Sequence, residues 1–186
     1  MSATQVKALR EQTGAGIMDC KRALTEAEGN MDRAVELLRQ QGLASAGKKA
    51  GRQAREGLIE SYIHNGNRIA ALVEVNCETD FVARTDDFRA LVRDVAMQVV
   101  AMNPTYVTAE EISDADREQG IKDHGDEKRF LEATVLMAQP FFKDSRRTIE
   151  DLIKGGIAKM GENIIVRRFT RYEVGESLSS DNATDA

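Results

Sequence analysis

Two stretches of alternating apolar and polar residues, joined by a short turn, constrain the fold of this chain more than any other feature. Leu58–Ile63 and Arg68–Asn76 alternate in the way that half-buried strands do, and His64-Asn65-Gly66-Asn67 separates them. Because Asn-Gly supplies the positive φ angles that tight turns need, the two segments predict an antiparallel hairpin.

A long amphipathic helix is predicted shortly after the hairpin. Thr85 opens it, and Asn103-Pro104 ends it. Its apolar positions recur at helical spacing and are Phe88, Leu91, Val92, Val95 and Val99. A helix over Thr148–Met160 and a closing strand over Ile164–Val174 are predicted in the same way. We therefore expect residues 58–174 to form an α+β core, an antiparallel sheet packed with helices.

Three short helices are predicted in residues 1–42. Ser2 and Gln5 fit a capping box at the start of the first helix. Gly29 fits a C-terminal cap for the second helix, and Gly42 is expected to close the third. Three helices in so little chain predict a compact bundle that resembles the ubiquitin-associated fold.

Residues 43–57 are predicted to be a basic linker, in part helical, between the bundle and the core. Ala and Gly alternate there with Lys48, Lys49, Arg52 and Arg55. A nucleic-acid surface is the alternative interpretation of such a run. Because the run has no aromatic residues for base stacking and the chain carries a net charge of -5, we expect a solvated connector and no nucleic-acid partner.

Acidic residues dominate residues 108–132, where we expect short surface helices interrupted at Gly120 and Gly125. Residues 130–142 are apolar enough to return to the core, and Pro140 is expected to end their helix. The polar, acidic segment 175–186 predicts a disordered tail.

The composition argues against several classes of protein. No apolar run approaches the roughly 18 residues of a membrane span, and the N-terminal residues lack the order of a signal peptide, so we expect a cytoplasmic protein. Cys20 and Cys77, with His64 and His124, are too few and too scattered for a metal site. Gly14-Ala15-Gly16 follows no strand and lacks a third glycine, so we expect no nucleotide or other cofactor.

Catalysis is also not expected. Cys77 and His64 are a conceivable nucleophile and base, but they fall at the ends of the predicted hairpin, and the sequence identifies no third group to orient them. We therefore expect that the chain is not an enzyme.

The connector between the second strand and the long helix contains an aromatic residue where polar residues are usual. Phe81 lies in Asn76-Cys77-Glu78-Thr79-Asp80-Phe81-Val82-Ala83-Arg84, and connectors mostly run over the surface. A Phe in a loop often packs into its own core instead. The two interpretations are an apolar tip for another protein and a buried core residue.

Two long motifs resemble the signatures of one family, elongation factor Ts, the guanine-nucleotide exchange factor of bacterial elongation factor Tu. The first is Glu-Thr-Asp-Phe-Val-Ala at residues 78–83, preceded by a strand ending in Glu-Val-Asn-Cys. The second is the run from Leu9 to Leu24. Residues 139–141 and 165–175 are also similar to family segments, so the resemblance covers most of the chain.

The resemblance implies how residues 79–82 act. Phe81 would enter an apolar crevice in the nucleotide domain of elongation factor Tu and disturb its Mg²⁺ and phosphate site. Asp80 would make polar contacts beside it, and Thr79 and Val82 would complete the loop.

The resemblance also assigns a second contact to the N-terminal bundle. Arg10, Ile17 and Met18 align with family residues that grip another helix of the same domain. The chain resembles a short form of the family, which we expect to pair as a homodimer through residues 58–174. The alternative function is a ubiquitin-associated-like interaction module without exchange activity, but this leaves the motif around Phe81 unexplained.

Overall fold

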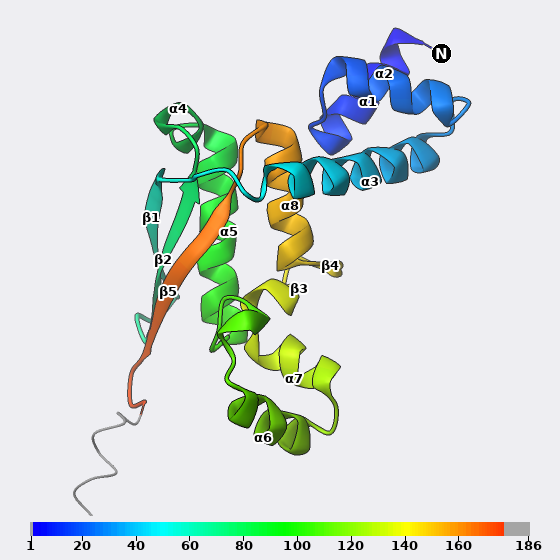
Figure 1. Ribbon diagram of the computed structural model, residues 1–186. Helices are drawn as coiled ribbons and strands as arrows, with labels where there is room; N and C mark the ends of the chain where they lie inside the picture. The colour runs from blue at the N-terminus through cyan, green and yellow to red at the C-terminus, as the bar shows by residue number, and fades with distance from the viewer. Residues whose placement is uncertain (1, 177–186) are drawn as a thin grey trace, which may run out of the picture.

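A three-stranded antiparallel sheet with helices on one face forms the centre of the computed structural model (Figure 1). The strands lie in the order β1-β2-β5 and span Glu56–Ile63, Ile69–Cys77 and Ile165–Glu173. The structure describes residues 2–176, apart from the side chains at positions 43 and 45. It confirms the predicted α+β class, with a helical N-terminal region before the sheet. The predicted tail of 175–186 lies almost wholly outside the described residues.

The predicted hairpin is confirmed as β1 and β2. Its register pairs Ile63 with Ala70, and the His64 amide donates to the Ile69 carbonyl at 2.9 Å. The left-handed residues of the turn are Gly66 and Asn67, with φ of 88° and 55°. The two positive φ angles therefore fall one residue later than the Asn-Gly pair suggested.

Three helices pack together at the N-terminus, as predicted. They are α1 (Ala3–Thr13), α2 (Ile17–Glu26) and α3 (Met31–Lys49). The Ser2 hydroxyl accepts from the Gln5 amide, and the Gln5 side chain accepts from the Ser2 amide, so the capping box is confirmed. Their small separate core consists of Leu9, Cys20, Ala23, Leu24, Ala27, Ala34 and Leu38.

The prediction that Gly42 ends the third helix was wrong. Helix α3 continues to Lys49, so much of the expected linker is helical, and β1 already begins at Glu56. A Cβ atom at Gly42 would lie 3.1 Å from the Cβ of Ala158 in α8 (Ile149–Met160), so the glycine lets the two helices approach closely. Ala46, one turn further along α3, is buried in the main core. Packing against α8 therefore outweighs the roughly 1 kcal/mol that glycine costs a helix.

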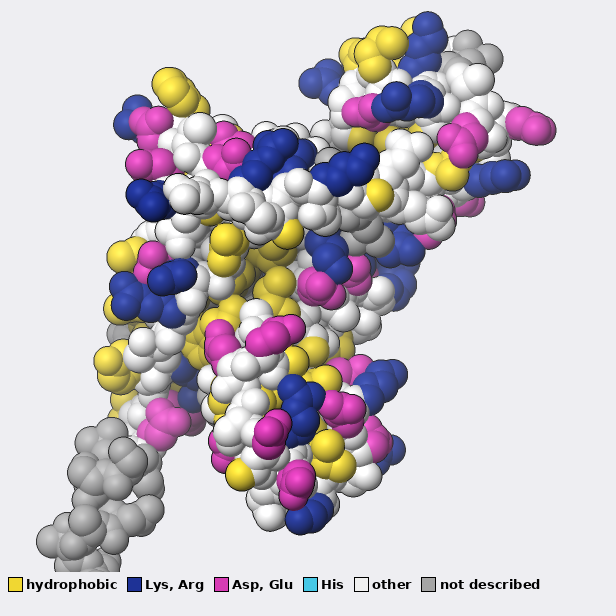
Figure 2. Space-filling model, in the orientation of Figure 1, with side chains coloured by type: hydrophobic (Ala, Val, Ile, Leu, Met, Phe, Trp, Pro, Cys, Tyr) yellow, Lys and Arg dark blue, Asp and Glu magenta, His cyan; other side chains and the backbone are white. Residues whose placement is uncertain are grey.

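The acidic segment forms a separate lobe at the far end of the sheet (Figure 1). Helices α6 (Asp114–His124) and α7 (Glu127–Thr134) lie between two 3-10 turns, η1 (Ala109–Glu111) and η2 (Leu136–Ala138). Figure 2 shows acidic and basic side chains intermixed over this lobe. No helix described between residues 2 and 176 combines the length and apolarity that a membrane span requires.

Two predictions for this segment were wrong. Gly120 does not interrupt a helix but lies buried inside α6, where the Phe130 ring covers it. The helix expected to end at Pro140 ends at Thr134, where the backbone of Val135 becomes extended, and Pro140 begins a short strand. This strand, β3 (Pro140–Phe141), pairs with β4 (Asp144–Thr148) in a hairpin that the polar sequence of β4 did not suggest.

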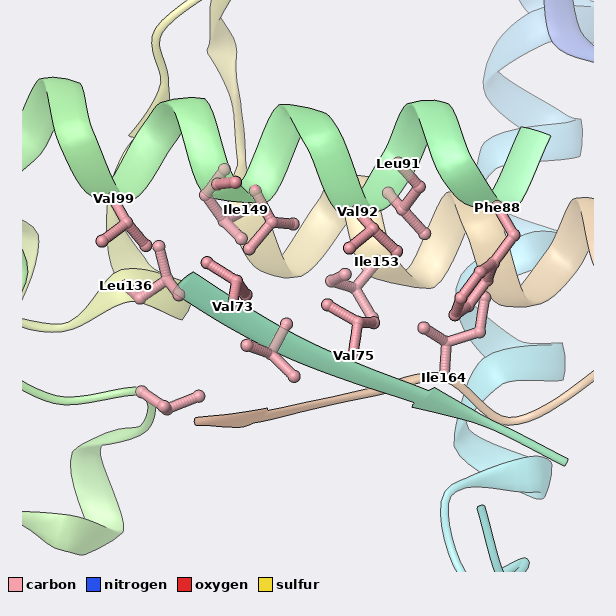
Figure 3. Packing of buried hydrophobic residues seen from close by; sticks show 14 of the residues in the cluster. Val73, Val75, Phe88, Leu91, Val92, Val99, Leu136, Ile149, Ile153 and Ile164 are labelled. Carbon is pink, nitrogen blue, oxygen red and sulfur yellow. The ribbon is translucent and has the colours of Figure 1, made fainter. Parts of the chain in front are cut away.

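Helices α5 (Asp86–Met102) and α8 cover the inner face of the sheet. The apolar pattern predicted this for α5 and predicted α8 as a helix. Thr85 caps α5 by accepting from the Phe88 amide at 3.2 Å. Figure 3 shows Val73 and Val75 of β2 among side chains of both helices. Full burial of one such side chain contributes about 1.5–3 kcal/mol, so this apolar face fixes the place of α5.

The glycine under Phe130 gives a test of this packing. A Cβ atom at Gly120 would lie 2.2 Å from the Phe130 ring, so Gly120→Ala should lower the free energy of unfolding by about 1–3 kcal/mol. Gly155→Ala in α8 is the matched control, since nothing lies within 4 Å of that position and alanine should add about 0.5–1 kcal/mol. Urea denaturation measures the free energy of unfolding of both variants. If Gly120→Ala raised it as much as Gly155→Ala does, the packing of α6 on α7 would be contradicted.

Candidate functional site

A single helical turn, α4 (Asp80–Ala83), follows β2 directly and carries the predicted contact residues. Thr79 caps it, since its hydroxyl accepts from the Val82 amide at 3.4 Å. The Arg84 amide donates to the Asp80 carbonyl at 3.2 Å and closes the turn. We call residues 79–84 the Phe81 turn. It is an ordered element and not an open loop.

Phe81 points out of the molecule. Its side chain is 79% exposed, whereas Ala83 is buried and Val82 packs against the main core. Successive residues of a helical turn point in different directions. Val82 and Ala83 therefore pack the turn on the core, while the Phe81 side chain points into solvent. The interpretation of Phe81 as a residue of its own core is therefore wrong.

Charged groups lie beside Phe81. The Arg84 guanidinium pairs with the Asp80 carboxylate at 2.7 Å, and both side chains are well exposed. An exposed pair of this kind contributes only about 0–1 kcal/mol to stability. Both groups are therefore available for polar contacts around an apolar tip.

A distant carboxylate holds the base of the turn. Glu162, which follows α8, accepts from the backbone amides of Glu78 and Thr79, each at 3.0 Å, and from the Thr79 hydroxyl at 2.6 Å. Sequence reasoning missed Glu162. It lies 83 positions from Thr79, and no local pattern marks it.

Cys77 is not placed to act as a nucleophile. Burial, with the Glu162 charge as a smaller cause, raises the pKa of its thiol to about 11. The thiol donates to the Thr79 carbonyl at 3.2 Å, and His64 lies at the opposite end of the hairpin. A thiol of this kind is inert at neutral pH. Among residues 2–176, no three His, Cys, Asp or Glu side chains form a group that could hold a metal ion.

The N-terminal bundle exposes a second apolar surface. Ile17 and Met18 begin α2 and are 55% and 69% exposed, and Arg10 is exposed in the last turn of α1. Figure 1 places the bundle and α4 at the same end of the molecule. Figure 2 shows hydrophobic side chains protruding from the surface there, over both elements.

Comparison with known proteins gives a consistent result. The family model for elongation factor TS matches residues 44–124. Elongation factor Ts of Moorella thermoacetica is 51% identical, covering 96% of this chain and 97% of that protein. Elongation factor Ts of Desulforamulus reducens is 50% identical, covering 96% and 91%, and that of Thermoanaerobacter pseudethanolicus is 46% identical, covering 98% of each.

The contrast between two phenylalanines tests the exposure of the turn. Phe81→Ala should change the free energy of unfolding by no more than about 0.5 kcal/mol, because the side chain has little core to lose. Phe88→Ala, at a fully buried position only seven residues on, should cost about 3–5 kcal/mol. Chemical denaturation of both variants measures the difference. A large loss with Phe81→Ala would show that the side chain packs into the core in solution.

Proposed function

This chain belongs to the elongation factor Ts family of translation elongation factors, and we propose that it binds elongation factor Tu carrying GDP and promotes GDP release, so that GTP can reload. The single observation that carries this proposal is the exposure of Phe81 on an ordered turn. An aromatic side chain that an ordered turn holds 79% exposed is suited to anchor a contact with another protein.

In this proposal, Phe81 acts by shifting groups around the partner's nucleotide site and not by forming a covalent bond. It enters an apolar crevice in the nucleotide domain of elongation factor Tu, and Asp80 makes polar contacts beside it. Magnesium requires near-octahedral oxygen geometry at short distances. A shift of about 1 Å in the partner's ligands therefore weakens its Mg²⁺ and the hold on the GDP phosphates.

The N-terminal bundle supplies binding area in the same complex. Ile17, Met18 and Arg10 contact another helix of the nucleotide domain, while the Phe81 turn reaches the nucleotide site. A factor that lowers the partner's affinity for nucleotide must itself bind the nucleotide-loaded partner less tightly by the same factor. Incoming GTP therefore expels it.

We propose that no covalent step, nucleic acid, membrane or cofactor takes part, and that the protein works in the cytoplasm, where translation elongation occurs. The alternative, an interaction module built on residues 1–40 alone, gives no reason for the exposure of Phe81. It also gives no reason for the hydrogen bonds that hold the Phe81 turn.

Release of a fluorescent GDP analogue from elongation factor Tu tests the proposal directly. The wild-type chain should accelerate release, and Phe81→Ala should lower the rate at saturating concentration by roughly tenfold or more. Truncation of a central aromatic contact costs about 2 kcal/mol or more, and ~1.4 kcal/mol corresponds to a factor of ten. No acceleration by the folded wild-type chain would overturn the proposal.

A variant of the bundle distinguishes binding from displacement. The double substitution Ile17→Ser and Met18→Ser removes apolar contact area without touching the Phe81 turn. We expect the concentration for half-maximal exchange to rise by roughly tenfold, while the saturating rate stays within about twofold. A lower saturating rate with an unchanged half-maximal concentration would show that these residues do more than bind.

We also propose that two copies of the chain pair through the outer face of the sheet. The helices cover the other face, and the outer face exposes Ile59, Ile63, Leu72, Ile165 and Tyr172. The register of the three strands puts these residues on one face, where Leu72 lies diagonal to Ile59, Ile63 and Tyr172. Arg168 and Glu74 form an ion pair at 2.7 Å on the same face. An apolar face of this kind suits isologous packing on its own copy.

Light scattering at micromolar concentration tests the pairing. The wild-type chain should have twice the monomer mass of 20.6 kDa, with or without reductant, because both cysteines are buried. Leu72→Lys should give the monomer, since two copies would bury like charges against each other. Met102→Lys places the same charge at an exposed apolar residue of α5 and should leave the dimer intact. A wild-type monomer with full exchange activity would contradict the pairing.

A further inference from the structure

Two residues between α8 and β5, Glu162 and Asn163, contact parts of the chain that are far apart in sequence. Glu162 reaches the Phe81 turn, and Asn163 reaches the segment that leaves α3. The segments that carry the family resemblance, residues 9–24, 78–83, 139–141 and 165–175, do not include this pair. Neither residue belongs to the exposed apolar surfaces described above.

Glu162 uses both carboxylate oxygens on the base of the Phe81 turn. One oxygen accepts from the amides of Glu78 and Thr79, and the other accepts from the Thr79 hydroxyl. Hydrogen bonds to an ionised acceptor are shorter and stronger than neutral ones. Two of these three donors belong to Thr79, the residue that caps the turn. The carboxylate therefore fixes the start of α4 on the end of α8.

Asn163 holds the other side of this junction. Its side chain is 2% exposed, and its amide nitrogen donates to the carbonyls of Ala50 at 3.3 Å and Arg52 at 2.8 Å. Its backbone amide donates to the Glu78 carboxylate at 2.6 Å. The exit from α3 and the entry to the Phe81 turn are thus bound to the same residue.

The last turn of α8 also contacts the bundle directly. A Cβ atom at Gly14, between α1 and α2, would lie 2.8 Å from Cε of Lys159, so the lysine stem passes in close contact with that loop. The Lys159 ammonium pairs with the Asp87 carboxylate of α5 at 2.7 Å. The end of α8 therefore joins the bundle, the start of α5 and the Phe81 turn.

We propose that Glu162 is a positioning residue for nucleotide exchange, which holds the Phe81 turn at a fixed place relative to the N-terminal bundle. This inference rests on the proposed function. Both surfaces must contact one partner domain at the same time, so their relative position decides whether Phe81 reaches its crevice once the bundle has bound. Glu162 does not itself contact the partner.

The test compares Glu162→Ala, Glu162→Gln and the wild-type chain in the release of a fluorescent GDP analogue from elongation factor Tu. Glu162→Ala should lower the saturating rate by roughly tenfold, because a misplacement of about 1 Å is costly in an oriented site. The half-maximal concentration should stay within about twofold, since the bundle is unchanged. Glu162→Gln keeps the shape and an acceptor oxygen and should fall between the two. Glu132→Gln, on an exposed pair in α7, is the matched loss of charge and should behave as wild type.

Amide hydrogen exchange of the free chain supplies a readout that does not depend on the partner. In Glu162→Ala, the amides of Glu78 and Thr79 should exchange roughly tenfold faster or more, because each loses a charged acceptor. The amides of Val73 and Val75 in β2 should keep their protection.

The outcomes separate this inference from the proposed function. A wild-type chain that fails to accelerate release overturns the proposed function, and this assignment with it. Acceleration by wild type and equally by Glu162→Ala overturns the assignment alone. If Glu162→Ala lost hydrogen-exchange protection equally across β2, Glu162 would have a general structural role. If this variant raised the half-maximal concentration and left the saturating rate unchanged, Glu162 would act in binding. Either result also overturns the assignment.

Discussion

The close packing of α8 against two other helices is the constraint on which the rest of the structure depends. On one side Gly42 of α3 meets Ala158, and on another a Cβ atom at Gly156 would lie 2.8 Å from a methyl group of Leu91 in α5. Small residues at these crossings bring the helix backbones together, so α8 is held against both the sheet-covering helix and the extension of the N-terminal bundle. Through this packing, α3 connects the bundle to the core by a packed helix where a solvated, partly helical linker was expected.

Buried polar groups then fix details that apolar packing leaves open. The Gln98 side chain donates to the Gln139 side chain and to the Pro140 carbonyl, each at 3.1 Å, and accepts from the Phe142 amide at 2.9 Å. Because a buried amide without partners is costly, these bonds allow only one position for the β3–β4 hairpin on α5. The half-buried Glu162 and the buried Asn163 act in the same way at the other end of α8. In both places a polar side chain from one element satisfies backbone groups of another.

The exposed apolar side chains on α4 and α2 differ from the core below them, because they do not stabilise the fold by burial. Phe81 on α4 and the pair Ile17 and Met18 on α2 stand on ordered helical turns, and all three are more than half exposed. Holding such side chains in water gains the folded chain nothing. In the complex proposed above, such pre-ordered contacts would lose little conformational entropy on binding. A rigid core under exposed tips fits a protein that acts on its partner by shape.

The sequence by itself determined the α+β class, the β1–β2 hairpin, the apolar faces of α5 and α8, the closing strand and the place of Phe81 after β2. These features follow from the periods of strand and helix and from the family motifs, which are local in the chain. Only the tertiary structure decided that α3 runs through Gly42, that Gly120 lies inside α6, that Asp144–Thr148 forms a strand and that Glu162 holds the Phe81 turn. Each of these depends on a contact with another helix, strand or turn, made by Ala158, Phe130, Pro140 and Thr79 respectively. Helix propensity and turn preference are small energies per residue, so a single close contact or a buried hydrogen bond outweighs them, and such contacts leave no pattern in the sequence nearby.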